Sequence, residues 1–170
     1  MKQTAGNAPP PAMKSRPLVG LFMRLAYRAD RLRRALSAPV SVGVRVLLVR
    51  DRQVLLVRHT YSPGLQLPGG GVKRGETLEQ AARREAREEA GAEIGEMSLF
   101  GLYSKTTGWI SDHEPVFLAT DFELAEQHSF EIESCAFYSL DNLPADLVPS
   151  ARRRIEEYRS GAGHVILGQR

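Results

Sequence analysis

The sequence predicts an α/β domain in which a β-sheet is packed between helices. Segments rich in β-branched and aromatic residues surround one long helical segment, and another helical segment follows them near the C-terminus. Strands and helices in this order bury their apolar faces by stacking as layers. Of the 170 residues, 42% are hydrophobic and 25% are charged, which is typical of one globular domain and excludes collagen-like and low-complexity chains.

The first 38 residues are predicted to lie outside this domain. Residues 1–16 contain a run of three prolines and no apolar period, which indicates a disordered leader. From Pro17 to Ser37, apolar residues recur at steps of three and four with arginines on the other faces, which predicts an amphipathic basic helix. We expect the domain itself over residues 39–160, followed by a C-terminal tail over 161–170.

Charge is distributed unevenly between the N-terminal arm and the rest of the chain. Residues 1–40 carry eight basic residues and one acidic residue, a net charge of +7. The other 130 residues hold 15 basic and 19 acidic residues, a net charge of −4. The domain therefore lacks the charge of a nucleic-acid-binding surface and is better suited to bind cations. The apolar run at 18–23 is interrupted by Arg24, well short of the roughly 18 to 20 residues that span a bilayer.

Cys135 is the only cysteine in the sequence. It permits no internal disulfide and no zinc site built from cysteines, so we expect a reducing, cytoplasmic compartment. Because it lies in an apolar, aromatic segment with Phe137, we expect a buried and unreactive thiol.

The strands are predicted from short runs of β-branched and apolar residues. Residues 40–49 and 54–57 are predicted to form a β-hairpin, because the turn residues Asp51 and Arg52 separate them. Later strands are expected at residues 97–104, 115–124 and 132–140. A final helix is expected over 150–159, buried through Ala151, Ile155 and Tyr158.

The long helix, predicted over residues 77–90, carries an acidic face. Thr77 and Gln80 make a capping box at its start, and Gly91 is expected to end it. At about 100° per residue, three carboxylates share one face beside a narrow apolar stripe: Glu85, Glu88 and Glu89, and then Ala82, Ala86 and Ala90. Such carboxylates repel by roughly a few tenths of a kcal/mol per pair unless a cation neutralises them. Their hard oxygens suit Mg²⁺, and Mn²⁺ can substitute. A solvated face is the alternative for the helix alone.

The glycines before the helix and the charged residues within it together resemble the Nudix box, the signature of the Nudix hydrolases. The positions that carry this resemblance are Gly70, Glu76, Arg84-Glu85-Ala86, Glu88-Glu89 and Gly91-Ala92. Ala86 and Ala92 stand where the box usually has bulky aliphatic residues, which affects the packing behind the helix and leaves the charged positions intact. The resemblance covers about residues 39–160 and implies the Nudix α/β/α sandwich, with a mixed β-sheet between helices.

The resemblance also implies roles for individual residues. Glu85, Glu88 and Glu89 would ligate a divalent metal, with the backbone carbonyl of Gly70 as a further ligand. Arg84 would orient the glutamates, with Glu76 as its salt-bridge partner. In Nudix hydrolases, water activated by the metal attacks a phosphorus of a diphosphate. The proton would pass to Glu85 or Glu88, or else to a carboxylate from a later loop.

The candidates for that additional carboxylate are Glu131 and Glu133, at the start of the strand expected at 132–140. Related proteins often place an acidic ligand or base in this region. We expect only one of the two to face the pocket. Arg58 and His59, at the end of a strand, are candidates for contact with phosphate or base, with an exposed strand-end pair as the alternative. Trp109 either stacks on a nucleobase or packs within its loop.

The function implied by the resemblance is magnesium-dependent hydrolysis of a nucleoside diphosphate linked to another moiety. A MutT-like nucleoside triphosphate pyrophosphohydrolase is favoured, because the marks of other subfamilies are missing from the sequence. The alternatives are an RNA 5′-end pyrophosphohydrolase, supported by the basic arm, and a non-catalytic nucleotide sensor, opposed by the complete set of glutamates. The leucine-rich face of the arm is expected to pack on the domain or on a second subunit in a homodimer, or else to bind an anionic membrane or RNA.

Overall fold

The computed structural model describes residues 21–22, 25–29, 32, 40–107, 110–126, 129–161 and 166–169. The predicted leader over residues 1–16 and the candidate Trp109 lie outside the described residues.

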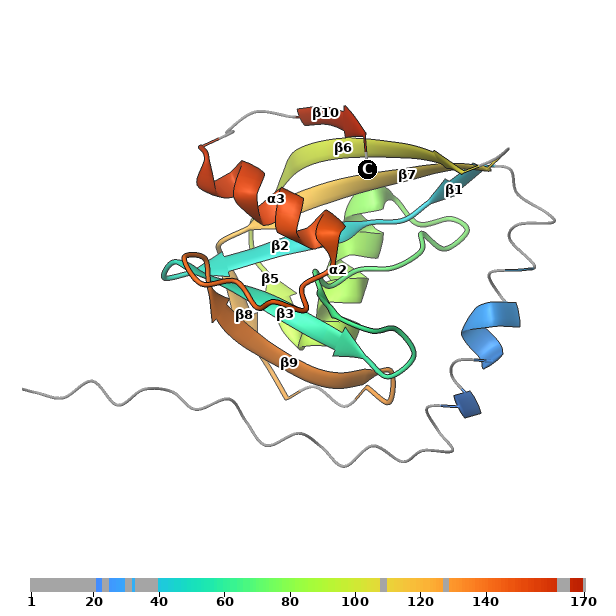
Figure 1. The fold of residues 1–170 in the computed structure, drawn as a ribbon, viewed down its shortest axis with the longest axis horizontal. Coiled ribbons are helices and arrows are strands. Elements are labelled where there is room, and N and C mark those ends of the chain that lie inside the picture. Colours follow the sequence, from blue (N-terminus) through green and yellow to red (C-terminus); the bar gives the residue numbers. More distant parts are fainter. Residues whose placement is uncertain are drawn as a thin grey trace, which may run out of the picture.

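A mixed β-sheet forms the centre of the molecule, with its main strands in the order β10-β6-β7-β2-β3-β4 (Figure 1). Short β1 also pairs with β7, β9 pairs with β3, and β5 and β8 form a separate two-stranded sheet. The strands are β1 Val40–Val42, β2 Arg45–Arg50, β3 Gln53–His59, β4 Leu65–Gln66, β5 Ala92–Ile94, β6 Ser98–Thr107, β7 Ile110–Ala119, β8 Phe122–Leu124, β9 Ile132–Ser139 and β10 Ile166–Gln169. The helices are α2 Leu78–Ala90 and α3 Pro149–Arg159.

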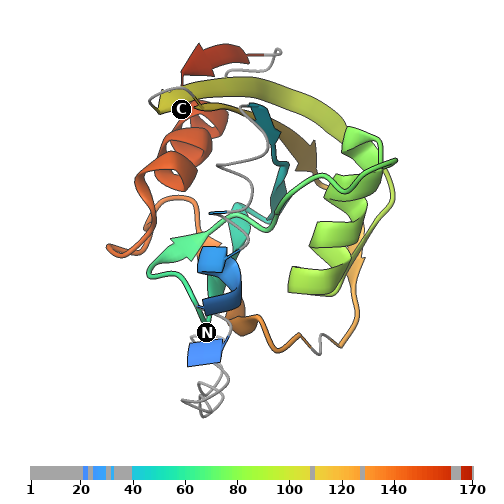
Figure 2. The ribbon, with the colours of Figure 1, turned by 90° about the vertical axis from the view of Figure 1, so that its right-hand side faces the viewer.

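Helices α2 and α3 lie on opposite sides of the sheet, as the side view in Figure 2 shows. The alanine stripe of α2 packs on one core, with residues such as Val46, Leu55 and Val57. Ala151 and Ile155 of α3 pack on the other core. The predicted α/β/α sandwich with a mixed sheet is therefore confirmed.

Helix α2 has the boundaries that its sequence predicts. The Thr77 side chain accepts a hydrogen bond from the Gln80 backbone N–H, and the Gln80 side chain accepts one from the Thr77 N–H. At the other end, Gly91 has a φ of 64°, the left-handed conformation that glycine adopts at low cost. These two caps fix where the acidic helix begins and ends.

The segment 40–49 forms two strands where one was predicted, and β7 begins five residues before the expected start at Pro115. Both differences arise because β1 and β2 pair with different parts of β7. Strand β1 pairs with residues 111–113 of β7, and β2 pairs with residues 116–119. Pro115 lies between these two sets of paired residues. At this point the pairing with β7 is interrupted, and the Val44 N–H donates to the Gly70 carbonyl and not to β7. Since proline has no N–H to donate, this break is where a sheet tolerates it.

Residues 166–169 form β10, although the segment 161–170 was expected to be a tail. β10 pairs in parallel with β6 at the edge of the sheet. This segment has no apolar alternation that would predict a strand. It is a strand because it pairs with the free edge of β6.

The described residues of the basic arm, 21–22, 25–29 and 32, are helical, as predicted. Leu21, Phe22, Leu25 and Leu32 are each more than half exposed, so the domain does not cover the leucine-rich face at these positions. Tyr27 instead stacks on Tyr61, with ring centroids 4.9 Å apart. Among the described residues, no helix has the length and apolar character needed to cross a membrane.

Candidate active site

Arg84 is the centre of the hydrogen-bond network on the acidic face of α2. Its Nε and Nη2 donate to the two carboxylate oxygens of Glu76, at 2.6 and 2.9 Å. Its Nη1 donates to Glu85 Oε1 at 2.6 Å and to Glu88 Oε2 at 3.2 Å, and Nη2 also donates to the Gly71 carbonyl at 3.1 Å. The planar guanidinium therefore holds three carboxylates and the glycine loop in one arrangement.

Glu85 lies buried against the loop that contains Gly70. A Cβ atom added to Gly70 would fall 2.6 Å from Glu85 Oε1, so only glycine leaves room for this carboxylate. The loop is held to the sheet by the Val44 N–H, which donates to the Gly70 carbonyl at 2.9 Å. Burial raises the pKa of Glu85, and the hydrogen bond from Arg84 opposes this rise.

Glu89 is held differently from the other two glutamates. It is 5% exposed, and its oxygens accept hydrogen bonds from His59 Nε2, at 2.6 Å, and from the Gly69 backbone N–H, at 2.8 Å. His59 is 3% exposed and lies at the end of β3, on the face that packs against α2. Its ring lies 4.9 Å from the ring of Tyr61.

The donor set fits a hard divalent cation. Glu85, Glu88 and Glu89 supply carboxylate oxygens from one helix face, and a carbonyl oxygen such as that of Gly70 keeps a second lone pair beside its bond to Val44. In the described part of the chain, no three acidic, histidine or cysteine side chains already converge on one point. The reason is visible in the network, because Arg84 holds Glu85 and Glu88 while His59 and Gly69 hold Glu89. Binding a cation would therefore require the carboxylates to rotate toward one point while Arg84 keeps its hydrogen bonds to Glu85 and Glu88.

The two candidate carboxylates of the later segment lie in different surroundings. The backbone N–H of Thr60 donates to the Glu131 carbonyl, and the charges of Glu89 and Glu131 both add to the effect of burial in raising the pKa of Tyr61. Glu131 therefore lies near Tyr61, whose ring packs against that of His59. Glu133 instead acts on Arg58, whose pKa is raised mainly by its hydrogen bond to Asp146.

The segment that holds Glu131 and Glu133 lies opposite an irregularity in strand pairing. In a regular strand, residues two apart share a face, so alternation would place both side chains on the same side. The register between β3 and β9 shifts between Arg58 and His59, opposite this segment. Such a bulge redirects the following side chains.

Arg58 is not brought to the carboxylate cluster. Its guanidinium pairs with Asp146, in the loop before α3 and therefore on the other side of the sheet from α2. Its contact with substrate stays a prediction. Cys135 is unsuited to act as a nucleophile, because burial raises the pKa of its thiol to about 12.

The family model for the NUDIX domain matches residues 39–158. The chain belongs to the Nudix family. Nudix hydrolases are pyrophosphohydrolases that generally use divalent metal ions, and this chain is a MutT-like enzyme of that class.

Relatives of this Nudix chain carry several different names. It is 31% identical over 121 residues to a Bacillus subtilis protein named "Putative 8-oxo-dGTP diphosphatase", covering 71% of this chain and 80% of that protein. It is 34% identical over 141 residues to "NAD-capped RNA hydrolase NudC" of Pseudomonas aeruginosa, covering 75% of this chain and 48% of the relative. The chain therefore spans about half the length of that NudC protein.

A solved structure supports the same Nudix fold. The MutT NUDIX hydrolase from Burkholderia pseudomallei superposes with a TM-score of 0.61 at 29% identity, covering 69% of this chain and 96% of that chain. The arm before residue 39 lies outside the matched Nudix domain.

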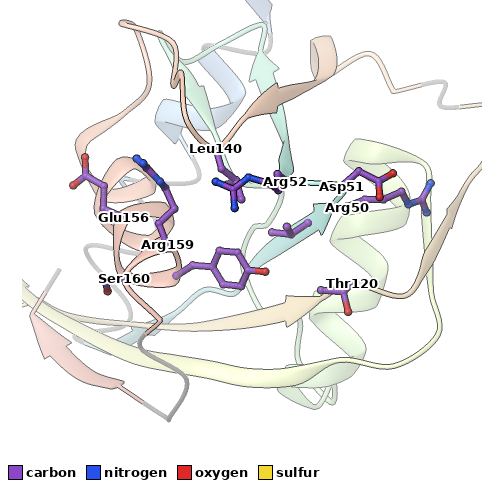
Figure 3. Close-up of a pocket in the computed structure, with 10 residues that line it drawn as sticks. Arg50, Asp51, Arg52, Thr120, Leu140, Glu156, Arg159 and Ser160 are labelled. Atoms are coloured by element: carbon purple, nitrogen blue, oxygen red, sulfur yellow. The ribbon is translucent and has the colours of Figure 1, made fainter.

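A separate pocket of about 850 Å³ lies at the other end of β2 and β3 from the Nudix carboxylates (Figure 3). Its three arginines already have partners. Arg50 donates to the Phe122 carbonyl, and Arg52 and Arg159 both pair with Asp141. None of the Nudix box residues lines this pocket. We therefore assign the chemistry to the acidic face of α2.

The roles of His59, Gln66 and the Gly69 N–H were missed by sequence reasoning. One signal pointed to a buried His59, because it is in phase with Leu55 and Val57 along β3. A buried ring nitrogen needs a hydrogen-bond partner. That partner is Glu89, which lies 30 residues away along the chain.

Replacing Gly70 with alanine is expected to lower turnover by about 10–100-fold, because the added Cβ would displace the Glu85 carboxylate. Activity would be measured over a range of Mg²⁺ concentrations, with thermal melting as a test of folding. Gly75→Ala in the same loop is the control, because its Cβ would meet nothing within 4 Å although its φ of +85° adds strain. An unchanged Mg²⁺ dependence in Gly70→Ala would contradict the assigned role of Glu85.

Glu131→Gln and Glu133→Gln are expected to behave unequally. Because Glu131 and Glu89 both lie near Tyr61, replacement of Glu131 should lower turnover on the order of 10–100-fold. Glu133→Gln, beside Arg58, should stay close to wild type. Turnover at saturating substrate measures both variants. Wild-type turnover in both variants would show that neither carboxylate takes part in the mechanism.

Proposed function

We propose that this chain is a magnesium-dependent hydrolase that cleaves the diphosphate bond of a nucleoside diphosphate linked to another moiety. The observation that carries this proposal is the acidic face of α2, where Glu85 and Glu89 are buried and Glu88 borders solvent, with all three carboxylates already hydrogen-bonded in place. Burying carboxylates this closely costs stability, which a site for a divalent cation explains.

In the reaction, a water oxygen forms a bond to one phosphorus, and the bridging P–O bond breaks to release two phosphate products and a proton. A divalent cation, when bound, neutralises charge on the diphosphate oxygens and lowers the pKa of water. Glu85, Glu88 and Glu89 would hold it, with the Gly70 carbonyl. Arg84 keeps Glu85 and Glu88 in position before the substrate arrives.

The chain offers two groups to accept the proton from the attacking water. Glu85 is suited to the task, since burial raises its pKa above that of an ordinary glutamate. Glu131 is the second, because it and Glu89 both lie near Tyr61 and it is exposed to solvent. The comparison of Glu131→Gln with Glu133→Gln distinguishes them.

Within this class, a nucleoside triphosphate is the substrate that we favour. The relative named as an 8-oxo-dGTP diphosphatase supports this choice, because the match covers most of both chains. An RNA 5′-end pyrophosphohydrolase is the second candidate. It is supported by the +7 charge of residues 1–40 and by a Caulobacter vibrioides relative named "RNA pyrophosphohydrolase", 45% identical over 83 residues.

The test is a substrate panel incubated with the full chain and Mg²⁺ or Mn²⁺, with products identified by mass. The panel contains NTPs, dNTPs including 8-oxo-dGTP, ADP-ribose, dinucleoside polyphosphates, sugar nucleotides and 5′-triphosphorylated RNA. We expect release of pyrophosphate from a triphosphate. Faster release from RNA, lost on raising salt or on deleting residues 1–38, would favour the RNA candidate. Nucleotide binding without any product would favour a sensor and contradict the proposal.

A further inference from the structure

His59 lies buried between two polar side chains, one on each ring nitrogen. Its Nε2 is 2.6 Å from Glu89 Oε1, and its Nδ1 is 2.5 Å from the amide nitrogen of Gln66. The amide nitrogen of Gln66 can only donate, so Nδ1 must accept. The ring hydrogen is therefore on Nε2, and it is donated to Glu89.

This tautomer orients Glu89 without placing a positive charge beside it. A neutral imidazole donates a hydrogen bond without adding a positive charge, whereas the guanidinium of Arg84 lies directly against Glu85 and Glu88. Ionised carboxylates have about four acceptor positions, two on each oxygen. Glu89 uses one on each oxygen, for His59 and for the Gly69 N–H. It is therefore oriented and still has acceptor positions for a cation.

The ring of His59 is itself held in place. Tyr61 packs against it at 4.9 Å between centroids, and Tyr27 from the basic arm stacks on Tyr61 at the same spacing. Gln66 reaches the ring from β4, the strand next to β3. Three elements of the fold thus determine where the Nε2–H points.

We propose that His59 is a positioning residue for the metal site, which, with its tautomer set by Gln66, holds Glu89 in the orientation that binds the cation. This proposal rests on the proposed function, because it takes Glu89 as a metal ligand. It replaces the expectation that His59 touches the substrate. Groups that hydrogen-bond to metal ligands typically affect metal affinity or activity by 10–100-fold.

The test measures Mn²⁺ affinity of the full chain without substrate, from the EPR signal of free Mn²⁺. His59→Leu removes the donor and should weaken Mn²⁺ binding by about 10–100-fold. His59→Gln places an amide N–H near the position of Nε2 and should restore most of the affinity. His113→Leu is the matched control, since His113 is also hydrogen-bonded, to Ser104 Oγ at 2.8 Å, but lies on β7. It should bind Mn²⁺ as wild type does.

Kinetics separate positioning from substrate contact. If His59 positions Glu89, His59→Leu should regain turnover as the Mn²⁺ concentration is raised, with little change in KM for the nucleotide. Wild-type Mn²⁺ affinity combined with a raised KM would overturn the proposal and return His59 to the substrate site. Should His59→Leu fail to melt cooperatively, Gln66→Leu provides the second test, and wild-type Mn²⁺ affinity in that variant would also overturn the proposal.

The proposed function can fail independently of this proposal. Weakened Mn²⁺ binding in His59→Leu would support the role of His59 even if no member of the substrate panel is hydrolysed. Unchanged Mn²⁺ affinity in Glu89→Gln would show that Glu89 is not a ligand and would overturn the proposal, whatever the outcome of the substrate panel.

Discussion

Glu88→Gln is expected to lower turnover on the order of 100-fold or more while leaving the fold intact. The substitution keeps the shape of the side chain and removes the charge that a divalent cation needs. Because the Glu88 side chain is about half exposed, little packing is lost. The loss of like-charge repulsion with Glu85 offsets the loss of the 3.2 Å bond from Arg84. Turnover at saturating Mg²⁺ and the melting temperature are the measurements.

The matched control for this experiment is Glu79→Gln on the same helix. Glu79 is exposed and pairs with Arg83, away from the buried face of α2. Its replacement should leave turnover close to wild type. Full activity in Glu88→Gln would show that the acidic face does not bind the catalytic metal.

Arg84→Lys is expected to lower turnover by about 10–100-fold, because one ammonium cannot replace a fork that reaches four partners. These partners are Glu76, Glu85, Glu88 and the Gly71 carbonyl. Arg84 also holds the pKa of Glu76 at about 2. Arg83→Lys is the control, since Arg83 pairs with Glu79 and not with the buried glutamates. A wild-type rate in Arg84→Lys would contradict the positioning role of Arg84.

The same variant has a predicted pH dependence. Burial raises the pKa of Glu85 and the Arg84 hydrogen bond lowers it, so weakening that bond raises the pKa further. The carboxylate must be ionised to bind a cation, and activity is therefore lost as the pH falls through this pKa. In Arg84→Lys, the acidic limb of the pH–rate profile should move to higher pH. An acidic limb at the wild-type pH would show that the pKa of Glu85 does not control the rate.

Local sequence was sufficient to predict helix α2 and the charged residues on it. The capping box at Thr77, the stop at Gly91 and the spacing of the three glutamates all act within 15 residues. A helix repeats every 3.6 residues whatever surrounds it, so the shared face of Glu85, Glu88 and Glu89 follows from their spacing. The link from Arg84 to Glu76 was predicted through the family resemblance, and the structure shows it as two hydrogen bonds.

Only the tertiary structure decided which distant residues meet that face. His59 and Arg58 are neighbours in the chain, but one holds Glu89 and the other pairs with Asp146, 88 residues away. The early start of β7, before Pro115, likewise depends on its pairing with β1 and β2. The edge strand β10 depends on its pairing with β6. Sequence periodicity determines which face a side chain occupies along its own element, but its partner comes from another element. That partner is set by strand register and layer packing, which short-range patterns do not encode.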